Sequence, residues 1–133
     1  MANESFTPKH LGHKVQQFQT PSKEILDTFQ NPGVHSVTFQ TDEMTSLCPK
    51  TGQPDWEEVS IVYQPDEKCL ESKSLKLYLQ SYRNEAAFME ELSTRIWNDL
   101  YAVLSPFYLA VTVTCSPRGG IALRAFKEGY KSA

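Results

Sequence analysis

The sequence of 133 residues predicts an α+β fold, in which an antiparallel sheet carries helices on one face. Two observations favour this class. Apolar and polar residues alternate toward both ends of the chain, which is typical of half-buried strands. Between these stretches the apolar residues recur every three to four positions, as they do in amphipathic helices. The expected order is β-β-α-α-β-β, with all four strands in one sheet.

The first half of the chain is predicted to supply two strands. Residues 21–33 have a short apolar pattern that predicts one or two helical turns, ended by Pro32 and Gly33. Residues 34–39 are the first expected strand, and residues 59–63 are the second. The Pro-rich and Gly-rich stretch between these strands is expected to be a loop.

The second half is predicted to supply two helices and two more strands. The helices are expected to separate near Arg83 and Asn84, with Asn84 as the N-cap of the second. On that second helix, Phe88 and Leu92 are expected on the core face. Strands are expected at residues 109–115 and 121–126, joined by the turn at residues 117–120.

Composition limits the classes of function. The net charge of −3 and the isoelectric point near 5.6 favour no stable binding of nucleic acid. No apolar run approaches the roughly 20 residues of a membrane helix, and residues 1–8 lack the apolar centre of a secretory signal. Three cysteines without framework spacing suit a reducing compartment. We therefore expect a cytoplasmic protein with an N-terminal arm at residues 1–20 and one domain at residues 21–133.

A four-stranded sheet with helices on one face leaves two edges and one face uncovered. Exposed edges favour pairing with other chains. Closure of several such sheets into a ring would satisfy both edges, so the pattern predicts self-assembly.

Two polar segments are candidates for chemistry. Residues 48–55 place Cys48 and Asp55 on one loop, where a thiol and a carboxyl can act as a nucleophile and its proton-transfer partner. Residues 71–78 contain Lys73 and Lys76 near an expected helix start, which suits phosphate oxygens. Taken singly, the first segment is better explained as a surface turn with an inert cysteine, and the second as a solvated charged face.

Together, these segments resemble the QueF family of nitrile reductases, which convert 7-cyano-7-deazaguanine to 7-aminomethyl-7-deazaguanine with NADPH in queuosine biosynthesis. The resemblance covers roughly residues 34–125 and has the length of the short single-domain type. It rests on four stretches, in the family's order: residues 45–55 (TSLCPKTGQPD), 71–76 (ESKSLK), 82–84 (YRN) and 117–121 (PRGGI). It implies the tunnelling fold, assembly into stacked barrel rings as a homo-oligomer, and active sites between neighbouring subunits.

The resemblance also implies a mechanism. Cys48 would add to the nitrile as a thiolate and form a thioimide, and Asp55 would be the general acid. Two NADPH molecules would complete the reduction to the amine, without a metal. A cysteine of ordinary pKa is mostly protonated at neutral pH, so a base or a positive field is expected near Cys48.

The remaining site residues follow from the family's pattern. Glu90 would anchor the guanine-like face, because a carboxylate accepts two parallel hydrogen bonds and this residue points away from the core face of its helix. Leu70, Glu71 and Ser72 match the other stretch that contacts the substrate. The family usually has histidine before the anchoring glutamate, and this chain has Met89, which changes one substrate contact.

The cofactor residues are likewise carried by the resemblance. Lys73, Lys76 and Arg118 match the positions that the family assigns to NADPH. Arg118 on its Gly-rich turn can hold a phosphate with paired donors. The other two cysteines are expected to be passive, Cys69 as incidental and Cys115 as core filler.

Three alternatives stay open. The first is a related amidinotransferase, which adds ammonia to a nitrile carried on tRNA and needs no NADPH. The second is the zinc-dependent cyclohydrolase branch of the fold, which needs closely placed Cys and His ligands, whereas His10, His13 and His35 all lie near the N-terminus. The third is a non-catalytic, ring-forming binding module, in which Cys48 would be dispensable.

Overall fold

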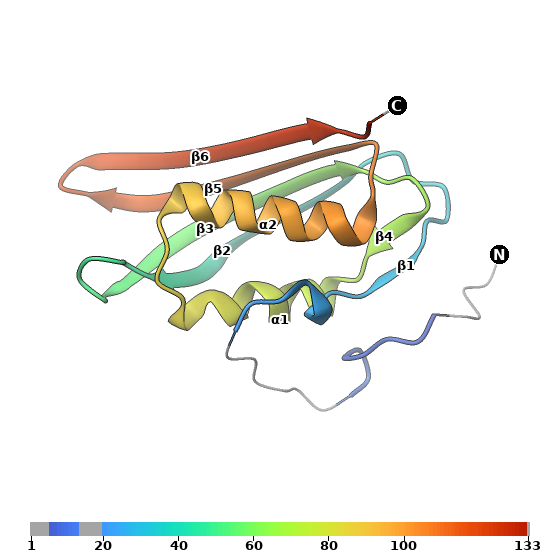
Figure 1. The fold of residues 1–133 in the computed structure, drawn as a ribbon, viewed down its shortest axis with the longest axis horizontal. Coiled ribbons are helices and arrows are strands. Elements are labelled where there is room, and N and C mark those ends of the chain that lie inside the picture. Colours follow the sequence, from blue (N-terminus) through green and yellow to red (C-terminus); the bar gives the residue numbers. More distant parts are fainter. Residues whose placement is uncertain (1–5, 14–19, 133) are drawn as a thin grey trace.

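A four-stranded antiparallel sheet forms one layer of the molecule (Figure 1). The computed structural model describes residues 6–13 and 20–132. The strands lie in the order β2-β3-β5-β6, so each hairpin partner is also a neighbour in the sheet. Their bounds are Val37–Leu47 for β2, Pro54–Gln64 for β3, Tyr108–Arg118 for β5 and Ile121–Tyr130 for β6.

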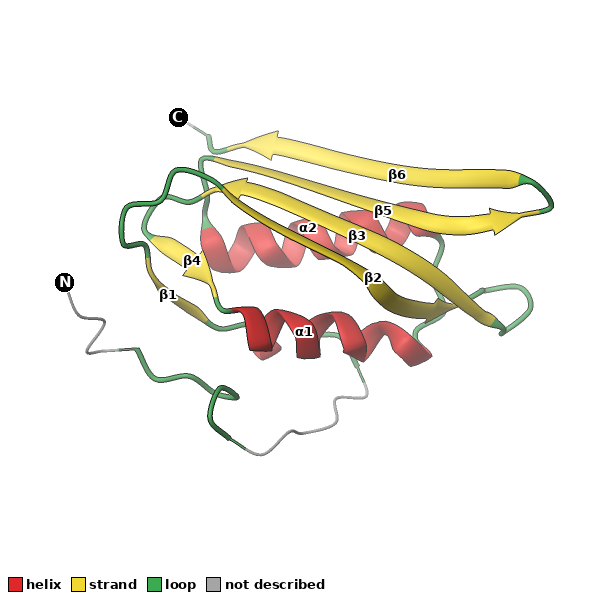
Figure 2. Ribbon diagram, turned by 180° about the vertical axis from the view of Figure 1, so that it is seen from behind, coloured by secondary structure: helices red, strands yellow, loops and turns green. Residues whose placement is uncertain are grey.

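Both long helices cover the same face of this sheet (Figure 2). They are α1 (Ser72–Gln80) and α2 (Met89–Leu104), joined by the 3₁₀ helix η2 (Ser81–Asn84). The predicted α+β class and the β-β-α-α-β-β order are thereby confirmed. Polar contacts join the helices, because the Tyr78 hydroxyl donates to Asp99 at 2.6 Å and lies 2.8 Å from the Tyr82 hydroxyl.

The core lies between the sheet and the helices. On α2 the side chains of Leu92, Ile96, Leu100 and Leu104 are at most 1% exposed. On β3 every second residue is buried against them. Those buried residues are Asp55, Glu57, Val59, Ile61 and Tyr63. The first two are carboxylic acids, so the polar end of this row lies at the start of β3.

A second, two-stranded sheet replaces the helical turns that were predicted for residues 21–33. The 3₁₀ helix η1 (Lys23–Ile25) is only three residues long, and β1 (Thr28–Gln30) then pairs with β4 (Lys68–Leu70). The helical prediction was wrong beyond this single turn, because pairing with β4 places Phe29 in a strand opposite Cys69.

Two details of the second helix were also predicted wrongly. Phe88, not Asn84, is the N-cap, since α2 begins at Met89 and Asn84 belongs to η2. Phe88 is half-exposed, at 50%, whereas Met89 is buried in the core. The Glu91 carboxylate accepts a hydrogen bond from the Phe88 N–H at 3.0 Å, which fixes the start of the helix.

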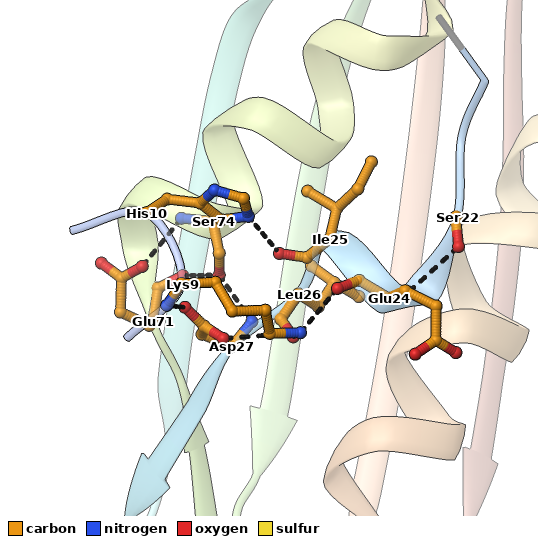
Figure 3. Close-up of polar contacts among 9 residues, drawn as sticks. All are labelled: Lys9, His10, Ser22, Glu24, Ile25, Leu26, Asp27, Glu71 and Ser74. Carbon is orange, nitrogen blue, oxygen red and sulfur yellow. Dashed lines mark hydrogen bonds and ion pairs between the residues drawn. The ribbon is translucent and has the colours of Figure 1, made fainter. Parts of the chain in front are cut away.

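The described part of the N-terminal segment lies against η1. The Lys9 ammonium donates to the carbonyls of Glu24 at 2.6 Å and Leu26 at 3.1 Å, and the His10 ring donates to the Ile25 carbonyl at 3.1 Å (Figure 3). Residues 1–5 and 14–19 of the predicted arm lie outside the described residues. Division into an arm at 1–20 and a domain at 21–133 stays a prediction, as does assembly into rings. None of the described helices combines the length and apolar character that a membrane crossing requires.

Candidate active site

The turn between β2 and β3 holds Cys48 in place. Its backbone N–H donates to the Gln53 carbonyl at 2.8 Å, and its carbonyl accepts from the Gly52 N–H at 2.9 Å. Gly52 has a φ of 71°, a left-handed conformation that glycine adopts without a Cβ clash. The thiol is half-buried at the end of the sheet, so it is reachable and yet fixed by a short ring of hydrogen bonds.

The surroundings of Cys48 favour the thiolate. A hydrogen bond from the Thr51 side chain lowers the pKa of Cys48 to about 7, helped by the backbone N–H groups of Thr51 and Lys50 and by the charge of Arg118. Burial raises the pKa of Cys48, but this effect is smaller than the combined lowering by the other causes. A substantial fraction of the thiol is therefore ionised at neutral pH, which meets the expectation of a positive field beside it.

Asp55 is placed by β3 and not by the turn itself. Pro54 is the first residue of this strand, a position that tolerates proline, so Asp55 already points into the buried face. It is 6% exposed and forms an ion pair with Arg118. The interpretation of Asp55 as a loop residue was wrong, because β3 begins earlier than its apolar pattern indicates.

Arg118 connects the two candidate reacting groups. It is the last residue of β5, and the turn that follows places Gly119 and Gly120 at φ values of 56° and 77°. The guanidinium also donates to the Pro54 carbonyl at 3.3 Å. Its positive charge therefore favours the ionised carboxyl of Asp55 and the ionised thiol of Cys48 at once.

The segment before α2 runs beside the residue that precedes the cysteine. The Leu47 N–H donates to the Glu85 carbonyl at 2.9 Å, and the Ala87 N–H donates to the Leu47 carbonyl at 3.2 Å. These bonds bring the start of α2 to the Cys48 end of the sheet. Glu90, in the first turn of α2, is exposed, whereas Met89 is 3% exposed. The predicted anchor thus faces outward while its neighbour packs inside.

The Glu71 carboxylate is bonded to the first turn of α1. One oxygen accepts from the Ser74 N–H at 2.8 Å (Figure 3), and the other accepts from the Lys73 N–H, also at 2.8 Å. The Ser74 hydroxyl in turn donates to the Glu71 carbonyl at 2.8 Å. Glu71 is therefore the N-cap of the helix. Of its predicted substrate-contacting neighbours, Leu70 is buried and Ser72 is exposed.

The two predicted phosphate-binding lysines lie on α1 but differ in surroundings. The Lys73 ammonium donates to the His13 carbonyl at 3.1 Å. Lys76 is exposed and lines a hollow of about 270 Å³ between α1 and β2, together with Ser72. Because Glu71 already occupies the N–H groups of Lys73 and Ser74, a phosphate at this helix end would be held by side chains.

Within one chain the candidate residues form two groups at opposite ends of α1 (Figure 2). Cys48, Asp55 and Arg118 lie where the β2–β3 and β5–β6 turns meet the start of α2. Leu70, Glu71 and Ser72 lie where β4 passes into α1. The structure therefore brings the candidate reacting groups together and leaves the second predicted substrate contact at the far end of the helix.

Three residues near Cys48 were missed by sequence reasoning. Thr51 stabilises the thiolate, and Ser46 and Glu57 form a buried pair in which the serine hydroxyl donates to the carboxylate at 2.6 Å. The signal for Glu57 was present, because Asp55, Glu57 and Val59 occupy alternate positions of one strand. Cys115, expected as core filler, is indeed part of the core, and Cys69 is buried.

Comparison with known proteins identifies the family. The family model described as QueF-like protein matches residues 54–133. A relative from Bacteroides fragilis, named NADPH-dependent 7-cyano-7-deazaguanine reductase, is 47% identical over 116 residues, covering 85% of this chain and 77% of its own. A relative of the same name from Bacillus velezensis is 50% identical over 103 residues, covering 75% and 63%.

A solved structure shows the same architecture. The apo form of an archaeosine synthase described as QueF-Like superposes with a TM-score of 0.68 at 29% identity, covering 72% of this chain and 94% of that one. The shared fold is the tunnelling fold that the family resemblance implied. On this similarity of sequence and structure, the chain belongs to the QueF family.

Proposed function

We propose that this protein is an NADPH-dependent nitrile reductase, which converts 7-cyano-7-deazaguanine to 7-aminomethyl-7-deazaguanine for queuosine biosynthesis. Relatives of that name at 47–50% identity support the substrate and the cofactor. The observation that carries the chemistry is the Cys48 thiol, whose pKa is lowered to about 7 beside the ion pair of Asp55 and Arg118. The cytoplasm, where thiols stay reduced, is the compartment in which such a group persists.

The first step is covalent. The Cys48 thiolate adds to the nitrile carbon, a C–S bond forms, one π bond of the nitrile breaks, and the nitrogen takes a proton. Asp55, paired with Arg118, is the candidate group that takes the thiol proton and passes it to that nitrogen. The product is a thioimide, whose carbon accepts a hydride more readily than the nitrile does.

The cofactor would be held by side chains of this chain. NADPH, when bound, would supply two hydrides to the carbon. Between them the C–S bond breaks, and the Cys48 sulfur leaves with the bonding electrons as a thiolate. Lys76, which has no hydrogen bond or ion pair to another described residue, is the cation best placed to receive a phosphate, with Lys73 one helical turn away. Arg118 is the third candidate, and a phosphate there would compete with Asp55. The fit is one of charge, and it suits a phosphorylated dinucleotide.

The substrate would be anchored by the exposed carboxylate of Glu90, with Met89 supporting the helix start from below. Leu70, Glu71 and Ser72 lie at the other end of α1, so we propose that they contact substrate bound at the Cys48 of a neighbouring subunit. A homo-oligomer of stacked rings with sites between subunits would meet this geometry. Because its carboxylate caps the helix, Glu71 would contribute chiefly by shaping the site.

Intact-protein mass spectrometry tests the covalent step. Incubation with 7-cyano-7-deazaguanine, without NADPH, is expected to add the full mass of one nitrile molecule per chain, because the addition expels no atom. Cys48→Ala should show no adduct, and Cys69→Ser, a matched change at a buried cysteine, should keep it. Absence of an adduct on the unmodified protein would contradict the proposal, as would an adduct on the alanine variant.

Two further measurements separate the alternatives. Loss of NADPH absorbance at two molecules per amine formed distinguishes a reductase from an amidinotransferase, which would leave NADPH unchanged. Mixing Cys48→Ala subunits with Ser72→Arg subunits tests the shared site. Activity should return in the mixture if one subunit supplies the cysteine and its neighbour supplies the α1 end, and two inactive parents that stay inactive after exchange would contradict a shared site.

A further inference from the structure

Glu57 is a buried carboxylic acid for which the proposed mechanism has no role. Its side chain is 1% exposed and lies on the same face of β3 as Asp55, two residues further along the strand. One carboxylate oxygen, Oε2, accepts a hydrogen bond from the Ser46 hydroxyl at 2.6 Å. The other, Oε1, has no hydrogen-bond partner among the residues that the structure describes. Burial of a carboxylate without a compensating charge lowers the stability of the fold, so its presence here needs an explanation.

Ser46 is hydrogen-bonded to one of the two carboxylic acids and is paired in strand register with the other. In the pairing of β2 with β3, Ser46 is directly opposite Asp55, and Met44 is opposite Glu57. Residues paired in this way have Cβ atoms about 4.5–5.5 Å apart. Ser46 is itself fully buried, and its hydroxyl reaches diagonally to Glu57. A hydroxyl is both a donor and an acceptor, so Ser46 can pass a proton between its two neighbours.

The surroundings of Glu57 are poor in charge. Burial raises the pKa of Glu57 to about 7, and the Ser46 hydrogen bond opposes this only in part. On β5 the residue paired with Glu57 is Cys115, whose thiol pKa is raised by its own burial and, to a smaller extent, by the charges of Glu57 and Cys48. Arg118 is already paired with Asp55.

In the helix layer, no described residue forms an ion pair with Glu57, and Arg95 of α2 is paired with Glu85 at 3.0 Å. In η2 the Tyr82 hydroxyl is bonded to Tyr78, and Arg83 is exposed. At the start of α2, Glu90 and Glu91 are both exposed, and Glu91 is engaged with the backbone of Phe88. Burial therefore favours the protonated form of Glu57, and no cation of the described residues opposes it by an ion pair.

The proposed reaction needs more protons than Asp55 can carry at one time. Conversion of a nitrile to a primary amine adds two hydrides to carbon and two protons to nitrogen. Asp55 can deliver the first proton, taken from the Cys48 thiol, and is then left as a carboxylate. A second proton must reach the nitrogen before the amine is complete, in a site where the nearby acids are shielded from water.

We propose that Glu57 stores this second proton and reloads Asp55 through the hydroxyl of Ser46. As the Glu57 carboxyl gives its proton to the Ser46 oxygen, the hydroxyl proton of Ser46 moves to the Asp55 carboxylate. Glu57 is left ionised, Asp55 is left neutral, Ser46 is unchanged, and no electrons are transferred. Glu57 thus acts through Asp55 and touches no reacting atom. This inference rests on the proposed function.

The test separates the first proton from the second. Glu57→Gln keeps a side chain of the same shape that can still bond to Ser46, but cannot release a proton at these pH values. Ser46→Ala keeps Glu57 and removes the hydroxyl between the acids. Glu58→Gln is the matched control, because Glu58 is the exposed neighbour on the same strand. For each variant, adduct formation is followed by rapid-quench mass spectrometry and amine formation by kcat, from pH 5.5 to 9.

The proposed relay predicts that these variants slow amine formation but not adduct formation. Glu57→Gln and Ser46→Ala should form the Cys48 adduct within about twofold of the unmodified rate, and should lose about tenfold or more in kcat. The fall of kcat as pH rises through about 7 should disappear in Glu57→Gln, and Glu57→Asp should recover part of the rate. Glu58→Gln should behave as the unmodified protein does in both steps.

Three results would overturn the relay. The first is an unchanged kcat and pH profile in Glu57→Gln, which leaves the reductase intact and removes the proton store. The second is a parallel loss of adduct and amine formation in both variants, which assigns Glu57 and Ser46 to structure alone. The third is an unmodified protein that forms neither adduct nor amine, which refutes the proposed function itself. If Glu57→Gln does not fold, as judged by circular dichroism, Ser46→Ala carries the same test.

Discussion

Replacement of Glu57 by Gln should change how the stability of this protein depends on pH. The carboxyl is 1% exposed, and burial raises its pKa from a usual 4.5 to about 7. Between these values the folded chain holds a proton that the unfolded chain has released. A group of this kind stabilises the fold fully below pH 4.5 and loses that contribution as pH rises through about 7. The Gln variant has no such proton and no such loss.

The size of the effect follows from the same two values. Each pH unit between them is worth about 1.4 kcal/mol, so the full difference is about 3 kcal/mol. Most of it falls between pH 5 and 8, where we expect Glu57→Gln to gain about 2–3 kcal/mol relative to the unmodified protein. The gain appears as pH rises, so the two stability curves should diverge toward alkaline pH.

Urea unfolding, followed by circular dichroism at pH 5, 6, 7 and 8, measures this difference. Protein concentration must be equal throughout, because any oligomer makes the midpoint depend on concentration. Glu58→Gln is the control, since it removes the same charge from an exposed neighbouring position. Stability curves for Glu57→Gln and the unmodified protein that stay parallel across this range would refute the account of Glu57 as a buried, proton-holding acid.

Three further changes test the thiol, the core and the substrate contact. Thr51→Val should raise the pKa of Cys48 above about 7 and slow iodoacetamide alkylation at neutral pH by about threefold or more, and an unchanged pH profile would exclude Thr51 as the main cause. Leu100→Ala, at a fully buried position of α2, should lower the free energy of unfolding by about 2–5 kcal/mol, and a loss below about 1 kcal/mol in urea titrations would contradict the described packing. Met89→His should tighten nitrile binding by placing a hydrogen-bond donor beside Glu90, and calorimetry in a Cys48→Ala background measures this affinity. The buried imidazole should lower the stability of the fold by about 1–3 kcal/mol. An unchanged or weaker affinity would count against this contact.

Periodicity predicted the helices and the sheet centre well because those residues face a single apolar layer. It underestimated the lengths of β2 and β3, for two physical reasons. In β2 a register shift between Thr41 and Met44 breaks the alternation, and residues 42–43 are both acidic. In β3 the first residue is Pro54, which reads as a turn although the first position of a strand accepts proline.

The candidate site could be predicted only where the residue type itself indicates the chemistry. Cys48 could be proposed as a nucleophile from its motif, but the cause of its lowered pKa could not be predicted. Thr51 acts through a hydroxyl direction set by the turn, and Arg118 acts through a strand end that is 63 residues from Asp55 in the sequence yet adjacent in space. The exchange of Phe88 and Met89 has a similar origin: the N-cap of α2 is Phe88, four residues after the predicted Asn84, so Phe88 is half-exposed and Met89 is buried.

The properties of Asp55 and Glu57 depend on the apolar side chains that follow them on the same face of β3. Val59, Ile61 and Tyr63 occupy the same face of β3 and are at most 1% exposed, so Asp55 and Glu57 form the polar end of an otherwise apolar layer. Asp55 is compensated by Arg118, whereas Glu57 has only a serine hydroxyl. Asp55 therefore has a cation beside it, whereas burial of Glu57 favours its protonated form. That difference is what a site needs if one carboxyl is to take a proton from a thiol while the other keeps one in reserve.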